Sequence, residues 1–164
     1  MNWSSVYFLY LTSRNDSYMK NLQEILKKED YIKIKFKVSK TQHLLVKTLL
    51  NGVKGNFILD TGASNSCVGL EFAEKFKLQT KSSKTQAAGA GAVGMFTLIS
   101  KKNEIELGKW KNKKIHLVLF DMSHVNQALS QHKVDTVDGI IGADILLKGK
   151  GIIDYNKRNL FLKK

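Results

Sequence analysis

Hydrophobic and polar positions change their period along the chain, and each change predicts a new element of secondary structure. From Tyr18 to Lys28 the hydrophobic residues fall at helical spacing, which predicts a short helix. From Ile32 to Val38 hydrophobic residues alternate with lysines, a pattern typical of a half-buried strand. The chain therefore opens with a helix and continues with a strand whose outer face carries lysine.

A predicted hairpin comes next, and its second strand ends at an acidic residue. Residues 43–50 predict one strand, and Asn51-Gly52 predicts a tight turn because both residues tolerate a positive φ. The hydrophobic residues within 55–59 predict a buried strand that stops at Asp60. An acidic side chain is thus expected at the end of a buried strand.

The rest of the chain favours short strands over helices. Residues 81–94 are small, polar and rich in glycine, which predicts a mobile loop or the tip of a hairpin. Further strands are expected at 95–100, 104–107, 114–120, 139–142, 151–154 and 159–162, and helical turns at 71–76, 126–132 and 143–147. These elements predict an all-β barrel or sandwich with one or two short helices over residues 31–164, preceded by an extension with a short helix over residues 1–30.

Composition and charge narrow the classes of function. The chain has 164 residues, 43% of them hydrophobic, which is enough for one domain with a real core. The formal net charge is +13, yet Arg14 and Arg158 are the only arginines. Because lysine lacks the planar fork with which arginine binds phosphates and base edges, we expect a lysine-coated surface and no specific nucleic-acid site.

The cysteine count and the length of the hydrophobic segments indicate the cellular compartment. The lone cysteine, Cys67, cannot form an internal disulfide, which favours a reducing environment. Residues 6–11 are hydrophobic but make a poor signal peptide, and no stretch approaches the length of a membrane helix. We therefore expect a cytoplasmic protein without a membrane partner.

The residues after Asp60 suit a catalytic carboxylate. Thr61 can donate a hydrogen bond, and Gly62 allows a backbone N–H to approach the carboxylate closely. An isolated Asp-Thr-Gly triplet is equally consistent with an ordinary turn at the end of a strand. The hairpin and the buried strand that precede Asp60 favour the catalytic interpretation.

Three segments in order resemble one family of enzymes. Segment 58–64, Ile-Leu-Asp-Thr-Gly-Ala-Ser, resembles the active-site loop of the retropepsin-like aspartic proteases. Segment 138–146, Asp-Gly-Ile-Ile-Gly-Ala-Asp-Ile-Leu, resembles the part of the family that crosses beneath the catalytic loop and braces it. The glycine-rich run 87–94 lies where the family has its flap, and 151–155 resembles its last strands. The resemblance, over residues 44–162, implies a single-lobe acid-protease barrel.

The resemblance also implies which residues would act. Asp60, Thr61 and Gly62 would form the catalytic loop of an endopeptidase, with Thr61 bonding across the two-fold axis of a dimer. The expected contacts to a peptide substrate are Ala63, Ala88, Gly89, Ala90 and Gly91.

Chemistry makes a homodimer the expected state. Peptide hydrolysis by this route uses two carboxylates that share one proton, one taking a proton from water and the other polarising the scissile carbonyl. The chain has one Asp-Thr-Gly, so Asp60 from each of two copies would complete one active site. No metal or other cofactor is expected, since the four histidines show no ligand spacing.

Specific roles are expected for four residues in and around these segments. Digestive-type relatives have a serine at the position of Ala63, where the hydroxyl helps to hold a carboxylate ionised, so we expect a less acidic pH optimum here. Asp144 is expected to cap a helix or to interact with its dipole, and Asp138 to brace a turn or loop. Cys67 is expected to pack in the core rather than to act as a nucleophile.

Other interpretations stay open. Residues 89–94 fit the dinucleotide pattern G-x-G-x-x-G, but polar residues precede the run and a strand-like segment comes after it, where a strand and a helix are required. The fold could instead belong to a catalytically silent module for peptide binding or assembly. The lysine excess could belong to a nucleic-acid-associated protein, whose binding would weaken steeply with salt.

Overall fold

The computed structural model describes residues 22–82, 87–89 and 92–164. Residues 22–28 form a helix, and β-strands dominate the remainder of the fold. The strands are β1 (Tyr31–Lys35), β2 (Lys37–Val38), β3 (Leu44–Leu50), β4 (Val53–Leu59), β5 (Cys67–Gly69), β6 (Thr80–Ser82), β7 (Ala87–Gly89), β8 (Ala92–Met95), β9 (Leu98–Leu107), β10 (Trp110–Phe120), β11 (Gly139–Ile141), β12 (Ile152–Asp154) and β13 (Asn159–Lys163). The other helical elements are a 3-10 turn (Leu70–Phe72), α2 (Ser123–Gln131) and α3 (Ala143–Lys148).

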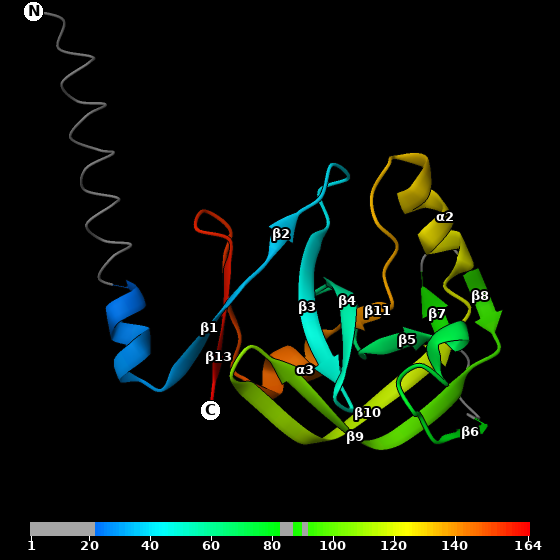
Figure 1. The fold of residues 1–164 in the computed structure, drawn as a ribbon, viewed down its shortest axis with the longest axis horizontal. Helices are drawn as coiled ribbons and strands as arrows, with labels where there is room; N and C mark the ends of the chain where they lie inside the picture. The colour runs from blue at the N-terminus through cyan, green and yellow to red at the C-terminus, as the bar shows by residue number, and fades with distance from the viewer. Residues whose placement is uncertain (1–21, 83–86, 90–91) are drawn as a thin grey trace, which may run out of the picture.

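Six of the strands close into a barrel (Figure 1). The large sheet runs β2-β3-β4-β11-β5-β10-β9-β6, and a further pairing of β3 with β9 joins its two sides. Strand β11 lies parallel to β4 and antiparallel to β5, so it holds two segments that are far apart in sequence. The expected all-β barrel is confirmed, with β11 as the strand that joins its halves.

A large hydrophobic cluster fills the barrel and the space beside it. The side chains of Leu50, Phe57, Ile105 and Leu119 are fully buried, as the alternation of buried and exposed positions along their strands requires. A smaller sheet of β1, β13 and β12 packs against the same cluster through Ile34 and other residues. The two sheets are also joined by the Trp110 indole N–H, which donates to the backbone carbonyl of Lys163 at 2.8 Å.

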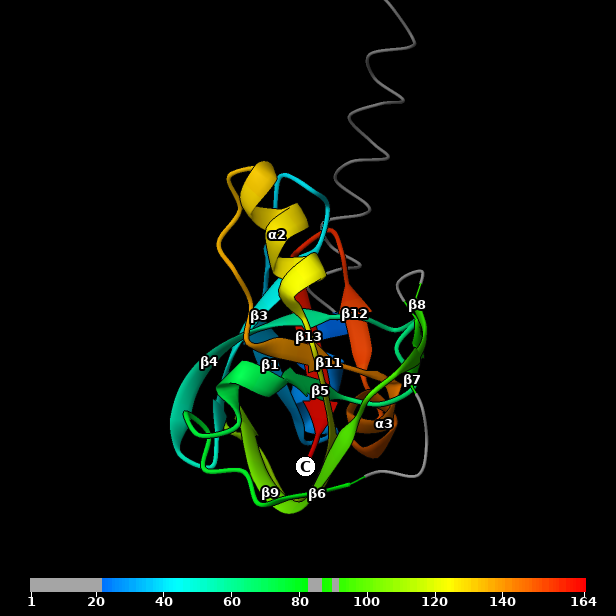
Figure 2. The same cartoon turned by 90° about the vertical axis from the view of Figure 1, so that its right-hand side faces the viewer.

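Helix α2 covers a second hydrophobic cluster and stands at the upper end of the molecule in Figure 2. Met122, Leu129 and Val137 are buried there with Ile58 of β4. The helix begins at Ser123, earlier than the expected 126–132, because the Asp121 carboxylate accepts the Ser123 backbone N–H at 2.8 Å.

Several boundaries differ from those expected from the sequence. The strands predicted at 95–100 and 104–107 are largely one strand, β9, and β10 begins at Trp110 rather than at 114. Gly108, at φ +59, makes the tight turn between them. The helical turn predicted at 71–76 shrinks to the 3-10 turn at Leu70–Phe72. None of the helices in the described ranges is both long and apolar enough to cross a lipid bilayer.

Candidate active site

Asp60 lies where strand β4 ends. Leu59 pairs with Ile141 in the parallel ladder of β4 and β11, and the backbone N–H of Asp60 then donates to the carbonyl of Ile141 at 3.0 Å. Leu59 is buried, whereas the Asp60 residue is only partly covered. The strand thus fixes the Asp60 backbone and leaves its carboxylate within reach of a substrate.

A backbone donor orients that carboxylate. The N–H of Gly62 donates to the Oδ1 atom of Asp60 at 2.8 Å. A Cβ atom at position 62 would lie 3.2 Å from the same oxygen, closer than most side chains approach a neighbour. Glycine therefore gives the carboxylate a donor without crowding it, while Thr61 is exposed beside it.

The loop after Asp60 rests on the start of helix α3. The carbonyl of Ala63 accepts the N–H of Ala143 at 2.7 Å. At Gly142, an added Cβ would lie 2.7 Å from that Ala63 oxygen and 2.8 Å from the carbonyl oxygen of Asn65. Only glycine at position 142 permits this close approach of the start of α3 to the loop after Asp60.

A buried hydroxyl ties the same two segments together. Ser66 is fully buried, and its Oγ donates to the Oδ1 atom of Asp144 at 2.7 Å and accepts the N–H of Gly142 at 2.8 Å. The Ser66 backbone N–H also donates to that carboxylate oxygen, at 2.9 Å. Sequence analysis missed Ser66, because a serine six residues after Asp60 has no pattern that marks it as buried.

Of the two roles expected for Asp144, the structure fits the interaction with the helix dipole and not the cap. Gly142 is the N-cap of α3 and no side chain caps that end, while Asp144 lies within the first turn. Its carboxylate is held by Ser66 instead of by the N–H groups of its own helix. The acidic side chain still lies at the positive end of the helix dipole, as expected.

Asp138 braces the outside of the same region. One carboxylate oxygen accepts the N–H of Asn56 in β4 at 2.8 Å, and the other accepts the Lys75 ammonium at 2.5 Å. The carbonyl of Asp138 accepts the N–H of Gly69, the last residue of β5. This residue is the loop brace that the sequence indicated.

The expected flap is a hairpin of its own. Strand β7 pairs only with β8 in the described residues, with Ala87 opposite Met95 and Gly89 opposite Ala92. Ala88 lies within β7, whereas Ala90 and Gly91 lie outside the described residues. The element after β8 is strand β9, so this run lacks the helix that dinucleotide binding requires.

The structure brings Asp60, Thr61, Gly62 and Ala63 together in one loop and places Ala88 and Gly89 on the separate hairpin. Cys67 lies beneath that loop, where burial raises the pKa of its thiol to about 12. The thiol is therefore protonated at neutral pH, which argues against a cysteine nucleophile. Asp60 is the acidic group of the loop that remains accessible.

A closed barrel with an Asp-Thr-Gly loop, braced from below by a glycine-bearing strand and helix, defines the class of retropepsin-like acid proteases. A family model described as aspartyl protease matches residues 46–145, which include the Asp-Thr-Gly loop and strand β11 beneath it. The chain belongs to this aspartyl protease family.

Two solved structures show the same fold. A retropepsin-like aspartic protease from Rickettsia conorii aligns with a TM-score of 0.53 at 23% identity, covering 80% of this chain and 89% of that one. The EIAV protease complexed with the inhibitor HBY-793 aligns with a TM-score of 0.50 at 19% identity, covering 68% and 91%. No curated protein sequence gave a significant match.

Proposed function

We propose that the protein is an aspartic endopeptidase whose active site is completed by a second copy of the chain. The observation that carries this proposal is a half-site: one oriented carboxylate, Asp60, at the open end of a braced strand. The whole sequence contains a single Asp-Thr-Gly. Hydrolysis through an activated water needs two such carboxylates, so a two-fold dimer supplies the second.

In this dimer the two Asp60 side chains share one proton. The ionised carboxylate takes a proton from the attacking water, while the protonated one donates a hydrogen bond to the scissile carbonyl. The carboxylate that received the proton from water then passes it to the leaving amine, so the pair again holds one proton. The Gly62 N–H holds each carboxylate in place before the substrate arrives. Catalysis then depends on groups that the chain positions in advance.

The neighbouring residues take the remaining roles. Thr61 is exposed beside Asp60, where its hydroxyl would bond across the two-fold axis and lock the two loops. Ala63 and the flap residues Ala88, Gly89, Ala90 and Gly91 would contact the backbone of an extended peptide. Because small residues leave room there, the neighbouring subsites would accept a range of side chains.

The first experiment compares the wild type with Asp60→Asn on a diverse peptide library. We expect Asp60→Asn to lower the cleavage rate by at least about 10³-fold, because the amide can neither take the proton from water nor donate one as an acid. Asp135→Asn, an exposed acid outside the loop, is the matched control and should keep full activity. A well-folded wild-type dimer that cleaves nothing would favour the silent binding module.

Mixing the two proteins tests whether the site is shared. If each active site needs two Asp60 side chains, an equal mixture with Asp60→Asn leaves about a quarter of the dimers active, because both subunits must be wild type. If each chain acts alone, about half of the activity remains. A result near one half would exclude the shared site while leaving the protease assignment standing.

The pH–rate profile tests the role of Ala63. Without a hydroxyl at this position the ionised carboxylate lacks one stabilising donor, so the activity maximum is expected well above pH ~2, with Ala63→Ser moving the acid limb to lower pH. An unchanged profile in Ala63→Ser would show that the missing hydroxyl does not set the optimum.

A further inference from the structure

Two cavities lie along β1, β3 and β4. The first, of about 650 Å³, lies between the helix 22–28, β1 and the turn of β9 and β10, and the second, of about 470 Å³, lies on β3 and β4. Gly108, in that turn, borders both. We call the two together the lysine groove, which is lined by Lys27, Lys33, Lys109, Lys164, Lys47, Lys54 and Lys75 among others.

Positive charge dominates the lysine groove. Four lysines and two acids line the first cavity, and three lysines and two acids line the second. Of the acids, Asp138 is paired with Lys75 and Glu106 with Lys111. Lys47, Lys54 and Lys109 are exposed and form no ion pair with any residue in the described ranges. The groove is therefore ready to bind negative charge.

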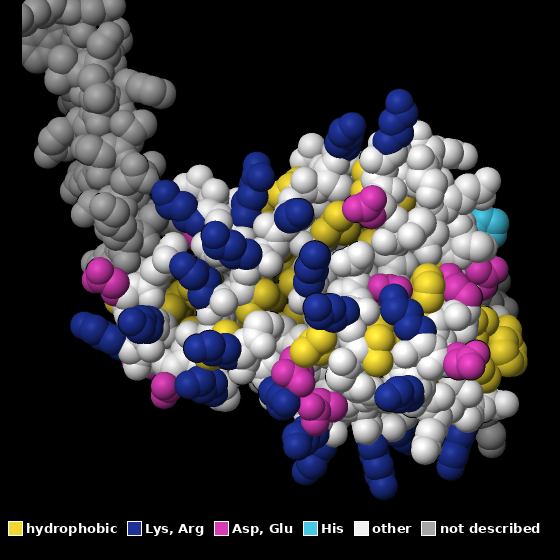
Figure 3. Space-filling view, in the orientation of Figure 1, with side chains coloured by type: hydrophobic (Ala, Val, Ile, Leu, Met, Phe, Trp, Pro, Cys, Tyr) yellow, Lys and Arg dark blue, Asp and Glu magenta, His cyan; other side chains and the backbone are white. Residues whose placement is uncertain are grey.

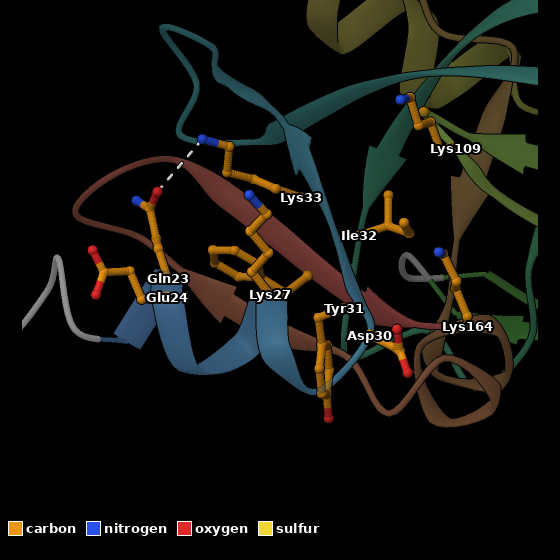
Figure 4. Close-up of a pocket in the computed structure, with 11 residues that line it drawn as sticks. Gln23, Glu24, Lys27, Asp30, Tyr31, Ile32, Lys33, Lys109 and Lys164 are labelled. Atoms are coloured by element: carbon orange, nitrogen blue, oxygen red, sulfur yellow. Dashed lines mark hydrogen bonds between the residues drawn. The ribbon is translucent and has the colours of Figure 1, made fainter.

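Hydrophobic side chains lie between these lysines. Ile32, Tyr31 and Phe161 line the first cavity and Leu49 lines the second. In Figure 4, Lys27 and Lys33 lie on one side of Ile32, and Lys109 and Lys164 on the other. Figure 3 shows the same alternation across this face, with hydrophobic patches exposed among basic side chains. A ligand here would combine acidic and apolar groups.

Strand β1 can contribute backbone hydrogen bonds to a ligand in the lysine groove. It is an edge strand of its sheet and pairs with β13 alone in the described part of the chain. In an antiparallel pair, alternate N–H and C=O groups of the edge strand point away from its partner. Such an edge can accept an added strand from another polypeptide, which a nucleic acid cannot supply.

From these observations we propose that the lysine groove binds an extended, acidic segment of another polypeptide, with glutamates or aspartates at the lysines and apolar side chains against Ile32 and Leu49. The groove has no arginine, which disfavours a nucleic acid as the occupant. A second copy of this chain has 14 acidic against 27 basic residues, so it offers few carboxylates to match the lysines of the groove. The first 21 residues carry Arg14 and Lys20 against Asp16, so they lack the acidic charge as well.

The test measures binding of a fluorescent peptide of about 12 residues with alternating glutamate and valine, long enough for a strand of typical length. The full chain is used with Asp60→Asn, so that cleavage cannot confuse binding and the result does not depend on catalysis. We expect Kd to rise at least about tenfold in Lys33→Glu/Lys109→Glu, and likewise in Lys47→Glu/Lys54→Glu, since each reverses charge in one cavity.

A matched variant separates the groove from overall charge. Lys101→Glu/Lys114→Glu makes the same change in net charge at exposed positions of β9 and β10 outside both cavities, and should change Kd by less than about twofold. Circular dichroism of each variant checks that it is folded. Equal losses in all three double variants would overturn the proposal, because binding would then depend on net charge alone.

Two further ligands complete the test. The same peptide with glutamine in place of glutamate should bind at least about tenfold more weakly, and its binding should be insensitive to salt. A single-stranded oligonucleotide of similar charge should bind more weakly than the acidic peptide. Tighter binding of the oligonucleotide, lost in the same groove variants, would overturn the polypeptide and identify nucleic acid as the occupant.

Discussion

The catalytic loop and the hairpin of β7 and β8 belong to the same proposed active site, yet they are held in opposite ways. The loop leaves a strand that is paired on both sides, and Ser66, Gly142 and Asp144 fasten it from below. The hairpin pairs only with itself among the described residues and stands at the right-hand edge of Figure 2. The loop is therefore part of the barrel, whereas the hairpin shares no strand pairing with the barrel in the described residues.

The difference has a physical reason in the residue types. Around the loop, the close contacts depend on particular residue types: Gly142 leaves room for two backbones, and the Ser66 hydroxyl accepts a backbone N–H. The hairpin is rich in alanine and glycine, which offer little side-chain surface to bury. A site that must hold a carboxylate still and admit a polypeptide needs both kinds of segment.

Hydrogen exchange tests the comparison most directly. In the Asp60→Asn protein, the backbone amide at position 60 is expected to exchange close to the rate of global unfolding, because it donates to the carbonyl of Ile141 in the barrel. The amides of β7 and β8 should exchange on the order of 10³-fold faster, through local opening. Equal protection of the two regions would show that the hairpin is anchored as firmly as the loop.

A glycine substitution in strand β11, beneath the loop, should strongly destabilise the fold. In Gly139→Ala the new Cβ would overlap the carbonyl of Cys67 and lie 2.7 Å from the Phe57 ring, and β11 cannot retreat because it pairs on both sides. We expect the free energy of unfolding to fall by about 3 kcal/mol, measured by urea denaturation.

The control for this variant is Gly52→Ala in the turn of β3 and β4. Nothing lies within 4 Å of an added Cβ there, so only the φ of +80 is unfavourable. That strain should cost about 1 kcal/mol. If the two variants were equally destabilised, close packing around β11 would not be the cause.

The loop that carries Asp60 was predictable from sequence because its signal is local. A hydrophobic strand, an acidic residue and a glycine are adjacent along the chain, and segment 138–146 carries its own glycines. The pairing of β3 with β9 that closes the barrel was not predictable, because Leu49 and Glu106 are far apart in sequence and belong to different hairpins. Sequence periodicity describes one element at a time and carries no record of such distant pairings.

Two errors in the predicted boundaries have the same origin. The lysines and Asn103 gave residues 101–103 and 108–113 no strand pattern, yet Asn103 is buried and bonded to Ser100 and Asn51. The polar side chain is satisfied only by partners that the tertiary fold provides. Helix α2 likewise begins early because Asp121 receives an N–H, a contact with no strong sequence pattern.

A smaller effect is expected when the buried hydroxyl of the loop is removed. Ser66→Ala leaves the N–H of Gly142 without its acceptor and takes one donor from the Asp144 carboxylate. We expect a loss of about 2 kcal/mol in the free energy of unfolding. Ser64→Ala, an exposed serine in the same loop, should change it by less than about 0.5 kcal/mol. A neutral Ser66→Ala would mean that the backbone contacts alone hold the loop.

The smallest effect on stability is expected from the ionisation of Cys67 at alkaline pH. Burial raises the pKa of this thiol from 9.0 to about 12 in the folded protein, so the folded state keeps a proton that the unfolded state loses. Its stabilising contribution is therefore complete below pH 9.0 and is lost as the pH rises toward 12. Relative to Cys67→Ala, the wild type should lose about 1.4 kcal/mol by pH ~10, in urea titrations of both proteins at each pH. A constant difference between the two curves from pH ~8 to ~10.5 would show that water reaches the thiol and that the floor of the catalytic loop opens more readily than its hydrogen bonds imply.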